Sequence, residues 1–356
     1  MAGLVAALDA FRGRRVFITG DTGFKGSWLA LWMHELGAKV VGFALPPEGE
    51  RCHFQLLGLE RLIRHVDGNI CDADALGRAF RQHRPEFVFH LAAQALVWRS
   101  YRDPKTTFDT NVGGSVNVLE LVRESSDVRA LVFVTSDKCY ANKEWIWSYR
   151  ENDELGGHDP YSASKAAAEI VFAGYLRAFF SERAGMGAAS VRSGNVVGGG
   201  DWSDHRIVPD IARAHESGTS VVLRQPLSVR PWHHVLDLLS GYLQLAHALA
   251  HRPAEFNGAW NFGPSDNKRH SVRELAQRLL ALWGGGRIEE RASEIHETAY
   301  LSLNCDKALR QLDWRGRWDF ERTIAETAAW YREVAAGVPA REVSLRQIRT
   351  YQEATK

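Results

Sequence analysis

Short apolar runs alternate with helical patterns through the first half of the chain. The apolar runs cover residues 15–20, 39–45, 87–91 and 130–134. Between them, segments 27–36 and 106–123 place apolar residues at helical spacing. Strands and helices that alternate at this length predict an α/β fold, a doubly wound parallel sheet with helices on both faces.

A glycine-rich loop follows the first predicted strand directly, with glycines at positions 20, 23 and 26. Glycine permits a tight turn and lets the backbone approach a pyrophosphate closely. The helix expected to start near Gly26 points its N-terminal amides at such an anion. Because the loop follows a strand and opens a helix at the start of the chain, it predicts a Rossmann-type dinucleotide site rather than a plain turn.

The pattern of the chain changes near residue 190, where segments of mixed character begin and glycine and proline become frequent. The run at 260–262 has the character of a strand that returns to the sheet. We therefore expect a discontinuous division into two domains. Residues 1–190 plus about 230–262 form the dinucleotide-binding domain, and about 191–229 plus 263–356 form a smaller α/β substrate-binding lobe.

The end of the second predicted strand carries less information about the cofactor. An acid that binds the ribose is expected soon after this strand, but the first acid is Glu48, so the position does not separate NAD from NADP. Residues 67–72 follow a third predicted strand. Asn69 could hydrogen-bond the adenine edge with its amide, although a simple turn explains the same residues.

Tyr161 and Lys165 lie four residues apart, so on a helix they share one face. A phenol alone titrates at a pH of about 10. We expect the nearby ammonium to lower the pKa of Tyr161 and make it a usable base near neutrality. The strand at 130–134 ends just before Ser136 and Asp137, at the sheet edge where ligands bind in such folds. Ser136 can complete a Ser-Tyr-Lys set by hydrogen-bonding a substrate hydroxyl.

These motifs resemble the extended short-chain dehydrogenase/reductase family, the NAD-dependent epimerases and dehydratases, over essentially the whole chain. The matching pieces are the glycine loop, the Tyr161–Lys165 pair and segments 90–93, 111–114 and 306–308. Within the family, the resemblance is to nucleotide-sugar 4,6-dehydratases, and it is carried by segments 23–29, 135–140, 194–202, 230–235 and 260–264. It implies a tightly bound NAD as cofactor and CDP-glucose as substrate.

The resemblance also implies which residues contact the two ligands. The expected cofactor contacts are Gly20, Thr22, Gly23, Phe24, Lys25, Gly26, Asn69, Ile70, Leu91, Ala92, Ala93, Gln94, Tyr161 and Lys165. Asn69 stands where the family has an aspartate. The guanidinium group binds phosphate bidentately, and the expected substrate contacts are Arg99, Asn195, Arg224, Arg230 and Tyr300. The histidines and cysteines have no metal-type spacing, so no metal site is expected.

The implied mechanism begins when Tyr161 removes the proton from the sugar C4 hydroxyl and hydride passes from C4 to NAD. The 4-keto group then makes the C5 proton acidic, water leaves from C6, and the hydride returns to C6. Asp137 is the expected acid, with a pKa raised by a dry pocket and lowered by nearby lysines. Lys138 is either the neutral base at C5 or a charged group that stabilises the enolate, and both alternatives stay open.

Composition narrows the class of protein further. The 356 residues carry a formal net charge of +1, which argues against a broad electrostatic grip on nucleic acid. We expect no membrane span and no secretory signal. Four scattered cysteines indicate reduced thiols and hence a cytoplasmic protein. Apolar positions in 106–123 and 163–179 could pack between subunits of a homodimer or homotetramer, but they could equally cover the sheet.

Two alternatives compete with the dehydratase prediction. An epimerase, or a dehydratase of a dTDP-, GDP- or UDP-linked hexose, would share the loop and the Tyr161–Lys165 pair. An epimerase does not need the acid/base pair at 137–138, so its presence favours elimination of water. A regulatory protein that has lost catalysis is expected to lack the tyrosine or the lysine, and both are present. The choice of nucleotide base rests on the resemblance alone.

Overall fold

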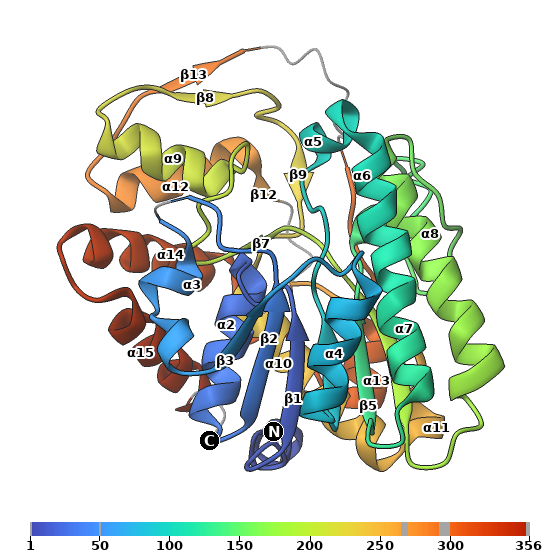
Figure 1. Ribbon diagram of the computed structural model, residues 1–356. Helices are drawn as coiled ribbons and strands as arrows, with labels where there is room; N and C mark the ends of the chain where they lie inside the picture. The colour runs from blue at the N-terminus through green and yellow to red at the C-terminus, as the bar shows by residue number, and fades with distance from the viewer. Residues whose placement is uncertain (1, 50, 265–269, 292–299, 354–356) are drawn as a thin grey trace.

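The computed structural model describes residues 2–49, 51–264, 270–291 and 300–353 (Figure 1). Its centre is a seven-stranded sheet in the order β11-β6-β5-β4-β1-β2-β3, and every neighbouring pair is parallel. The strands are β1 Arg15–Thr19, β2 Lys39–Ala44, β3 Arg64–Asp67, β4 Phe87–His90, β5 Ala130–Val134, β6 Gly187–Ser193 and β11 Gly258–Phe262. The predicted α/β fold is confirmed, and the strand order reverses between β1 and β4.

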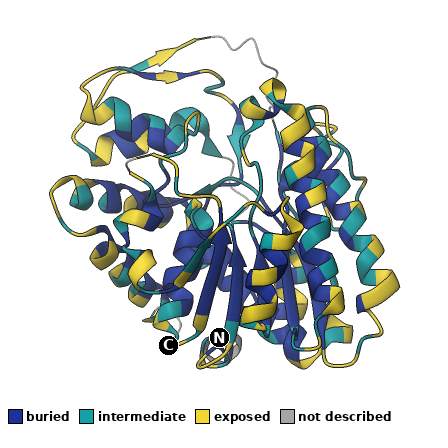
Figure 2. Cartoon of the chain, in the orientation of Figure 1, coloured by how far each residue is buried: buried dark blue, intermediate teal, exposed yellow. Residues whose placement is uncertain are grey.

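Two groups of helices cover the two faces of the sheet, and the central strands are buried on both sides (Figure 2). Val16 and Val132 face one group, whereas Phe17 and Leu131 face the other. Strands buried on both faces carry continuous apolar runs, and for this reason the sequence pattern predicted these segments as strands. The first group is α1 Ala2–Asp9, α2 Phe24–Glu35 and α10 Val235–His251, and the second is α4 Ala73–His83, α7 Ser115–Glu124 and α8 Pro160–Tyr175.

The helix predicted at 27–36 begins earlier than expected, at Phe24, so the last glycine of the loop lies inside its first turn. The helix predicted at 106–123 is present as a continuous run. It consists of α6 Pro104–Phe108, a π-helical turn Asp109–Gly114 and α7. The π-helical turn lies against the end of β3, where a Cβ atom at Gly114 would stand 2.6 Å from Ile70 Cδ1.

A second layer lies beyond the carboxyl ends of the strands (Figure 1). Its elements are β7 Val196–Val197, α9 Ile207–Glu216, β8 Val221–Leu223, β9 Val229–Arg230, β10 His233–His234, β12 His270–Ser271, α12 Val272–Leu282 and β13 Ile288–Glu290. They form the two-stranded pairs β10-β7, β12-β9 and β13-β8. The remaining segments are α3 His53–Leu56, η1 Leu59–Arg61, α5 Val97–Arg102, η3 Asp137–Cys139, η4 Leu176–Phe180, α11 Pro253–Phe256, α13 Asp306–Leu312, α14 Phe320–Ala335 and α15 Ala340–Glu353.

The strand predicted at 260–262 is β11, which pairs with β6 at the edge of the sheet. The boundaries of the two-domain division stay a prediction. Helices α13 and α15 fall in the predicted substrate lobe, yet α13 packs on β11 and α15 packs on α2. Parts of the division lie outside the described residues, at 1, 50, 265–269, 292–299 and 354–356.

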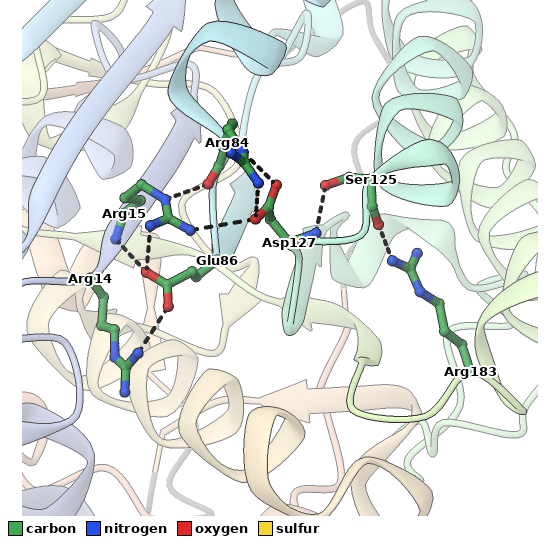
Figure 3. Close-up of polar contacts among 7 residues, drawn as sticks. All are labelled: Arg14, Arg15, Arg84, Glu86, Ser125, Asp127 and Arg183. Carbon is green, nitrogen blue, oxygen red and sulfur yellow. Dashed lines mark hydrogen bonds and ion pairs between the residues drawn. The ribbon is translucent and has the colours of Figure 1, made fainter.

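Figure 3 shows a cluster of charged side chains from segments at the amino ends of β1, β4 and β5. Glu86 accepts a hydrogen bond from Arg14, and Asp127 accepts two from Arg84. Arg15 lies between them, 3.8 Å from Glu86 and 3.7 Å from Asp127. These exposed pairs contribute little stability individually. These arginines lie at the amino edge of the sheet, so any arginine that contacts a ligand at the carboxyl edge is a different one.

Candidate active site

A cavity of about 350 Å³ lies at the carboxyl edge of the sheet, within the usual size range of small-molecule sites. Parallel sheets of this type bind ligands at this edge, next to the point where the strand order reverses. The wall of the cavity includes nine of the predicted site residues, which come from the glycine loop, the end of β5, α8 and the second layer: Phe24, Lys25, Ser136, Asp137, Lys138, Tyr161, Asn195, Arg224 and Arg230.

The glycine loop has the shape that a pyrophosphate needs. Gly20 has φ +79°, and a Cβ atom there would lie 2.7 Å from the Ala92 nitrogen. A Cβ atom at Gly26 would lie 2.0 Å from the Gly20 carbonyl oxygen, whereas one at Gly23 would meet no atom closer than 3.4 Å. Gly20 and Gly26 are therefore required by the fold, and Gly23 leaves open space beside the loop.

The amino end of α2 is also suited to an anion. Its N-cap residue, Gly23, provides no side-chain hydrogen bond to the first turn. Uncapped amides and the positive end of the helix dipole together bind phosphate groups. The residues present therefore fit the dinucleotide that the loop predicts. Lys25 lies in this first turn and lines the cavity, and burial lowers its pKa to about 7, with further lowering by Arg206 and Lys165.

Three predicted cofactor residues lie where β2 and β3 end. The Thr22 hydroxyl donates to the Leu45 carbonyl at 3.0 Å. Asn69 is exposed, and its Oδ1 accepts a hydrogen bond from the Cys71 amide at 2.9 Å, so its NH₂ group is the part left for an adenine edge. Ile70 is buried. Their contacts with the adenosine part of the cofactor stay predictions.

Four predicted cofactor residues follow β4: Leu91, Ala92, Ala93 and Gln94. The Leu91 and Ala92 amides donate to Thr19 of β1, which holds this segment beside the glycine loop. The Gln94 side chain donates to the Leu96 carbonyl at 3.1 Å and accepts from the Leu96 amide at 2.7 Å. Its amide group thus braces the loop, and the contact of Gln94 with the cofactor stays a prediction.

Tyr161 and Lys165 lie in the first turns of α8. Asp159 caps this helix by accepting from the Ser162 amide at 2.9 Å, and Pro160 occupies the first helical position. Burial raises the pKa of Tyr161 to about 12, while a hydrogen bond with Ser136 and the charge of Arg206 lower it. The predicted fall of the tyrosine pKa was therefore wrong for the protein alone, because the loss of solvation outweighs the nearby cations.

Lys165 is also buried, with 5% of its surface exposed. Burial lowers its pKa to about 8, and the charge of Glu169, one helical turn further on, opposes that change. The cation that lowers the Tyr161 pKa is Arg206, which the sequence analysis did not single out. Arg206 lines the cavity and donates to Asp201 at 3.0 Å.

The acid/base motif forms the short helix η3 at the end of β5. The Ser136 hydroxyl accepts from the Lys138 amide at 3.2 Å and donates to Asp137 Oδ1 at 3.0 Å. Burial raises the pKa of Asp137, and Lys138, Ser136 and Arg230 lower it by smaller amounts. A raised pKa favours a protonated carboxyl group, as the role of an acid requires. Lys138 is half-buried in the same wall.

Three of the five predicted substrate residues line the cavity: Asn195, Arg224 and Arg230. The Asn195 carbonyl accepts from the His233 amide at 3.2 Å, beside the pairing of β7 with β10. Arg224 donates to His205 Nδ1 at 2.8 Å.

The other two predicted substrate residues do not line the cavity. Arg99 is exposed, and its Nη1 lies 3.9 Å from Glu48 Oε1. Tyr300 pairs with Val229, the neighbour of Arg230 in β9, so it lies close to the wall without forming it. Their contacts with substrate stay predictions.

Several cavity residues were missed by the sequence analysis. Four polar or aromatic ones are Trp98, His205, Arg206 and Asp210. Asp210 and Arg206 lie at the start of α9, where an ordinary amphipathic helix pattern concealed them. No local signal identifies such residues, because their function depends on facing strands that are distant in the sequence. Among the described residues, no group of three or more His, Cys, Asp or Glu side chains could hold a metal ion.

Comparison with known proteins agrees with this geometry. Residues 16–263 match the model of the NAD dependent epimerase/dehydratase family. The chain is 43% identical to the CDP-glucose 4,6-dehydratase of Salmonella typhimurium, over 97% of this chain and 98% of that protein.

Two solved structures have the same fold. A dTDP-glucose 4,6-dehydratase double mutant from Streptomyces venezuelae, with NAD and DAU bound, is 26% identical and has a TM-score of 0.77 over 91% of this chain and 98% of its own. An epimerase from Methanothermobacter thermautotrophicus is 24% identical and has a TM-score of 0.80 over 95% of this chain and 97% of its own. From the matched family model and the full-length identity, the chain belongs to the NAD-dependent epimerase/dehydratase family.

Proposed function

We propose that this protein is a CDP-glucose 4,6-dehydratase, a hydro-lyase that converts CDP-D-glucose to CDP-4-dehydro-6-deoxy-D-glucose and water. The observation that carries the proposal is the buried Asp137 carboxyl group in the same cavity as Tyr161. An epimerase needs the tyrosine but has no leaving hydroxyl to protonate. The high identity to the Salmonella enzyme supports the same activity and the cytidine nucleotide.

The glycine loop, the amino end of α2 and Lys165 would hold NAD, which would supply a hydride acceptor for C4 and the hydride source for C6. Tyr161 accepts the proton of the C4 hydroxyl. The charge of Arg206 stabilises the phenolate that this step requires, and so does Ser136 when its hydroxyl turns from Asp137 to donate to Tyr161. Arg206 is therefore an addition to the Ser-Tyr-Lys set.

Elimination of water follows from the carbonyl group formed at C4, which acidifies the C5 proton. Asp137 gives its proton to the C6 hydroxyl as the C6–O bond breaks, so that water leaves. Lys138 is either the base that takes the C5 proton or the cation that stabilises the enolate. Arg230, Arg224 and Asn195 hold the diphosphate and sugar, because guanidinium groups match phosphate oxygens.

The activity is tested with the purified, NAD-loaded protein and four separate substrates: CDP-glucose, dTDP-glucose, GDP-mannose and UDP-glucose. We expect mass spectrometry to show the loss of one water from CDP-glucose alone. Loss of water from a different sugar nucleotide would keep the dehydratase and overturn the base. No loss from any substrate would overturn the dehydratase.

The role of Lys138 is tested separately with Lys138→Met. This variant is expected to accumulate reduced cofactor, seen by its absorbance, while product formation falls by about 100-fold or more. Product formation at the wild-type rate would remove Lys138 from the mechanism.

The protein is further proposed to act as a homodimer or homotetramer in the cytoplasm. Ile170 and Phe179, on α8 and the turn after it, are 60% and 50% exposed, which supports an apolar subunit contact there. All four cysteines are unpaired, which supports a reducing compartment. No helix in the described part of the chain is long and apolar enough to span a membrane. Light scattering on the purified protein measures the subunit number.

A further inference from the structure

Two groups of charged side chains contribute residues to the wall of the cavity. One surrounds the reaction centre, where Asp137 interacts with Lys138 and Arg230. The other lies in the second layer, where Asp210 interacts with Arg213, His205 and Arg224. A nucleotide sugar that places its hexose at Tyr161 extends its base away from that centre. Asp210, His205 and Arg224 line the same cavity as Tyr161, so the second group is the candidate to meet the base.

Four carboxylates line the cavity: Asp137, Asp159, Asp201 and Asp210. Asp137 lies at the reaction centre. Asp159 is used at both oxygens by Ser162, at 2.9 and 2.6 Å. Asp201 is likewise used, by the Ser203 amide at 3.1 Å and by Arg206 at 3.0 Å. Asp137 therefore belongs to the chemistry, and both oxygens of Asp159 and of Asp201 already accept a hydrogen bond from within the protein.

Asp210 differs because one of its oxygens is left over. Its Oδ1 accepts from Arg213 Nη2 at 2.6 Å, and Oδ2 has no partner in the described part of the chain. Burial raises the pKa of the Asp210 carboxyl group, and the hydrogen bond and charge of Arg213, with the charges of His205 and Arg224, oppose that rise. An ionised carboxylate only accepts hydrogen bonds. With Oδ1 paired to the Arg213 guanidinium, the ligand group that suits Oδ2 is a hydrogen-bond donor.

The surroundings of Asp210 suit a flat, aromatic ligand. The rings of Trp98 and His205 both line the cavity, with centroids 4.8 Å apart. Leu223 of β8 and Pro209 add apolar surface to the same wall. Aromatic side chains offer faces on which any base can stack, so they give affinity without choosing the base. The choice has to come from a polar group at the edge of the base.

Cytosine, uracil and thymine differ at that edge. Cytosine carries an amino donor at C4, where uracil and thymine carry a carbonyl acceptor. Facing a carboxylate, the amino group forms a hydrogen bond, whereas the carbonyl oxygen places two acceptors against each other. We propose that Asp210 accepts a hydrogen bond from the 4-amino group of the substrate cytosine and so selects cytidine nucleotides over uridine and thymidine nucleotides. This inference rests on the proposed function, which supplies cytosine as the base.

The test compares Asp210→Asn with the wild-type, NAD-loaded enzyme. An asparagine can turn either its oxygen or its NH₂ group toward the base, so it accommodates both edges. Dissociation constants for CDP, UDP and dTDP are measured by calorimetry, which does not depend on turnover. We expect the preference for CDP over UDP and dTDP to fall by about 10- to 100-fold, the size of discrimination that one such base contact provides.

A matched control is Asp204→Asn. Asp204 also lies near Arg213, at 3.7 Å, but it is 74% exposed and is not part of the cavity wall. This variant is expected to keep the wild-type preference. If Asp210→Asn weakens all three diphosphates equally, the residue only supports α9 and the inference is wrong.

The outcomes separate this inference from the proposed function. Wild-type enzyme that dehydrates only CDP-glucose, together with an Asp210→Asn variant of unchanged preference, would overturn the role of Asp210 and leave the function intact. Wild-type enzyme that binds dTDP or UDP as tightly as CDP would overturn the selection itself. Dehydration of dTDP-glucose in place of CDP-glucose would overturn the base assignment in the proposed function.

Discussion

Glu169 and Arg192 form an ion pair in the interior of the protein, beneath the catalytic motif. Glu169 Oε2 lies 2.7 Å from Arg192 Nη2, and the side chains are 2% and 4% exposed respectively. The hydroxyl groups of Thr135 and Ser190 also donate to Glu169, and Thr135 directly precedes Ser136. Replacing Glu169 with glutamine removes the negative charge and nearly preserves the volume of the side chain.

The cost of Glu169→Gln follows from the arginine that remains. Arg192 would stay buried without an anion, and breaking a buried pair in this way costs about 3–5 kcal/mol. That is a large part of a typical total stability of about 5–15 kcal/mol. The change also reaches Lys165, because the charge of Glu169 opposes the effect of burial on the lysine pKa. In the variant, the pKa of Lys165 falls further below its ordinary value.

The assay is urea unfolding followed by circular dichroism, on wild-type protein and variants at the same NAD concentration. Glu120→Gln is the control, because Glu120 pairs with Arg123 on the surface and the two side chains are 39% and 37% exposed. Its loss should be under about 1 kcal/mol. A loss of under about 1 kcal/mol for Glu169→Gln as well would refute the argument from burial.

Three further predictions follow from the site and its supports. Tyr161→Phe should lower product formation by about 100- to 10,000-fold with NAD binding retained, and unchanged turnover would remove the tyrosine from the chemistry. Gly23→Ala should keep the melting temperature but weaken NAD binding by about 10-fold or more, whereas Gly20→Ala should also destabilise the fold. Calorimetry measures the loss of NAD binding, and thermal melts measure the loss of stability. Burial raises the pKa of Asp237 to about 6 from 3.8. Its contribution to stability is therefore fully present below about pH 4 and falls by about 3 kcal/mol as the pH rises from 4 through 6. The stability deficit of Asp237→Asn, measured by urea unfolding at several pH values, should shrink over that window.

Much of the fold could be predicted from the sequence because its signals are local. Strands buried on both faces appear as short apolar runs, and the intervening helices show their own period. The glycine loop was recognisable because its glycines directly follow a strand, and Gly26 is required by Gly20 and Asp21 of the same loop, whereas Gly20 is required by Leu91 and Ala92 from the end of β4. The helix start at Phe24 was placed too late, since Gly26 was taken as the opening residue although it packs inside the first turn.

The candidate site was predicted only in part. Motif residues that follow one another in the chain, such as Ser136 and Asp137, reached the same cavity as Tyr161 as expected. Arg99 instead lies outside the cavity wall, beside Glu48, and the Gln94 side chain forms hydrogen bonds with Leu96 of its own loop. Neither result has a sequence signal, because each depends on which partner a side chain meets after folding.

The sequence by itself determined the α/β alternation, the dinucleotide loop and the spacing of Tyr161 and Lys165, since these depend on residues close together in the chain. Only the tertiary structure decided the electrostatics and the far wall of the cavity. Burial, not a neighbouring lysine, dominates the pKa of Tyr161, and Arg206 is the cation that opposes it. Asp210 faces the cavity because α9 packs beneath β8. Solvation and charge act through space, so they are set when distant segments meet and cannot be read from their order along the chain.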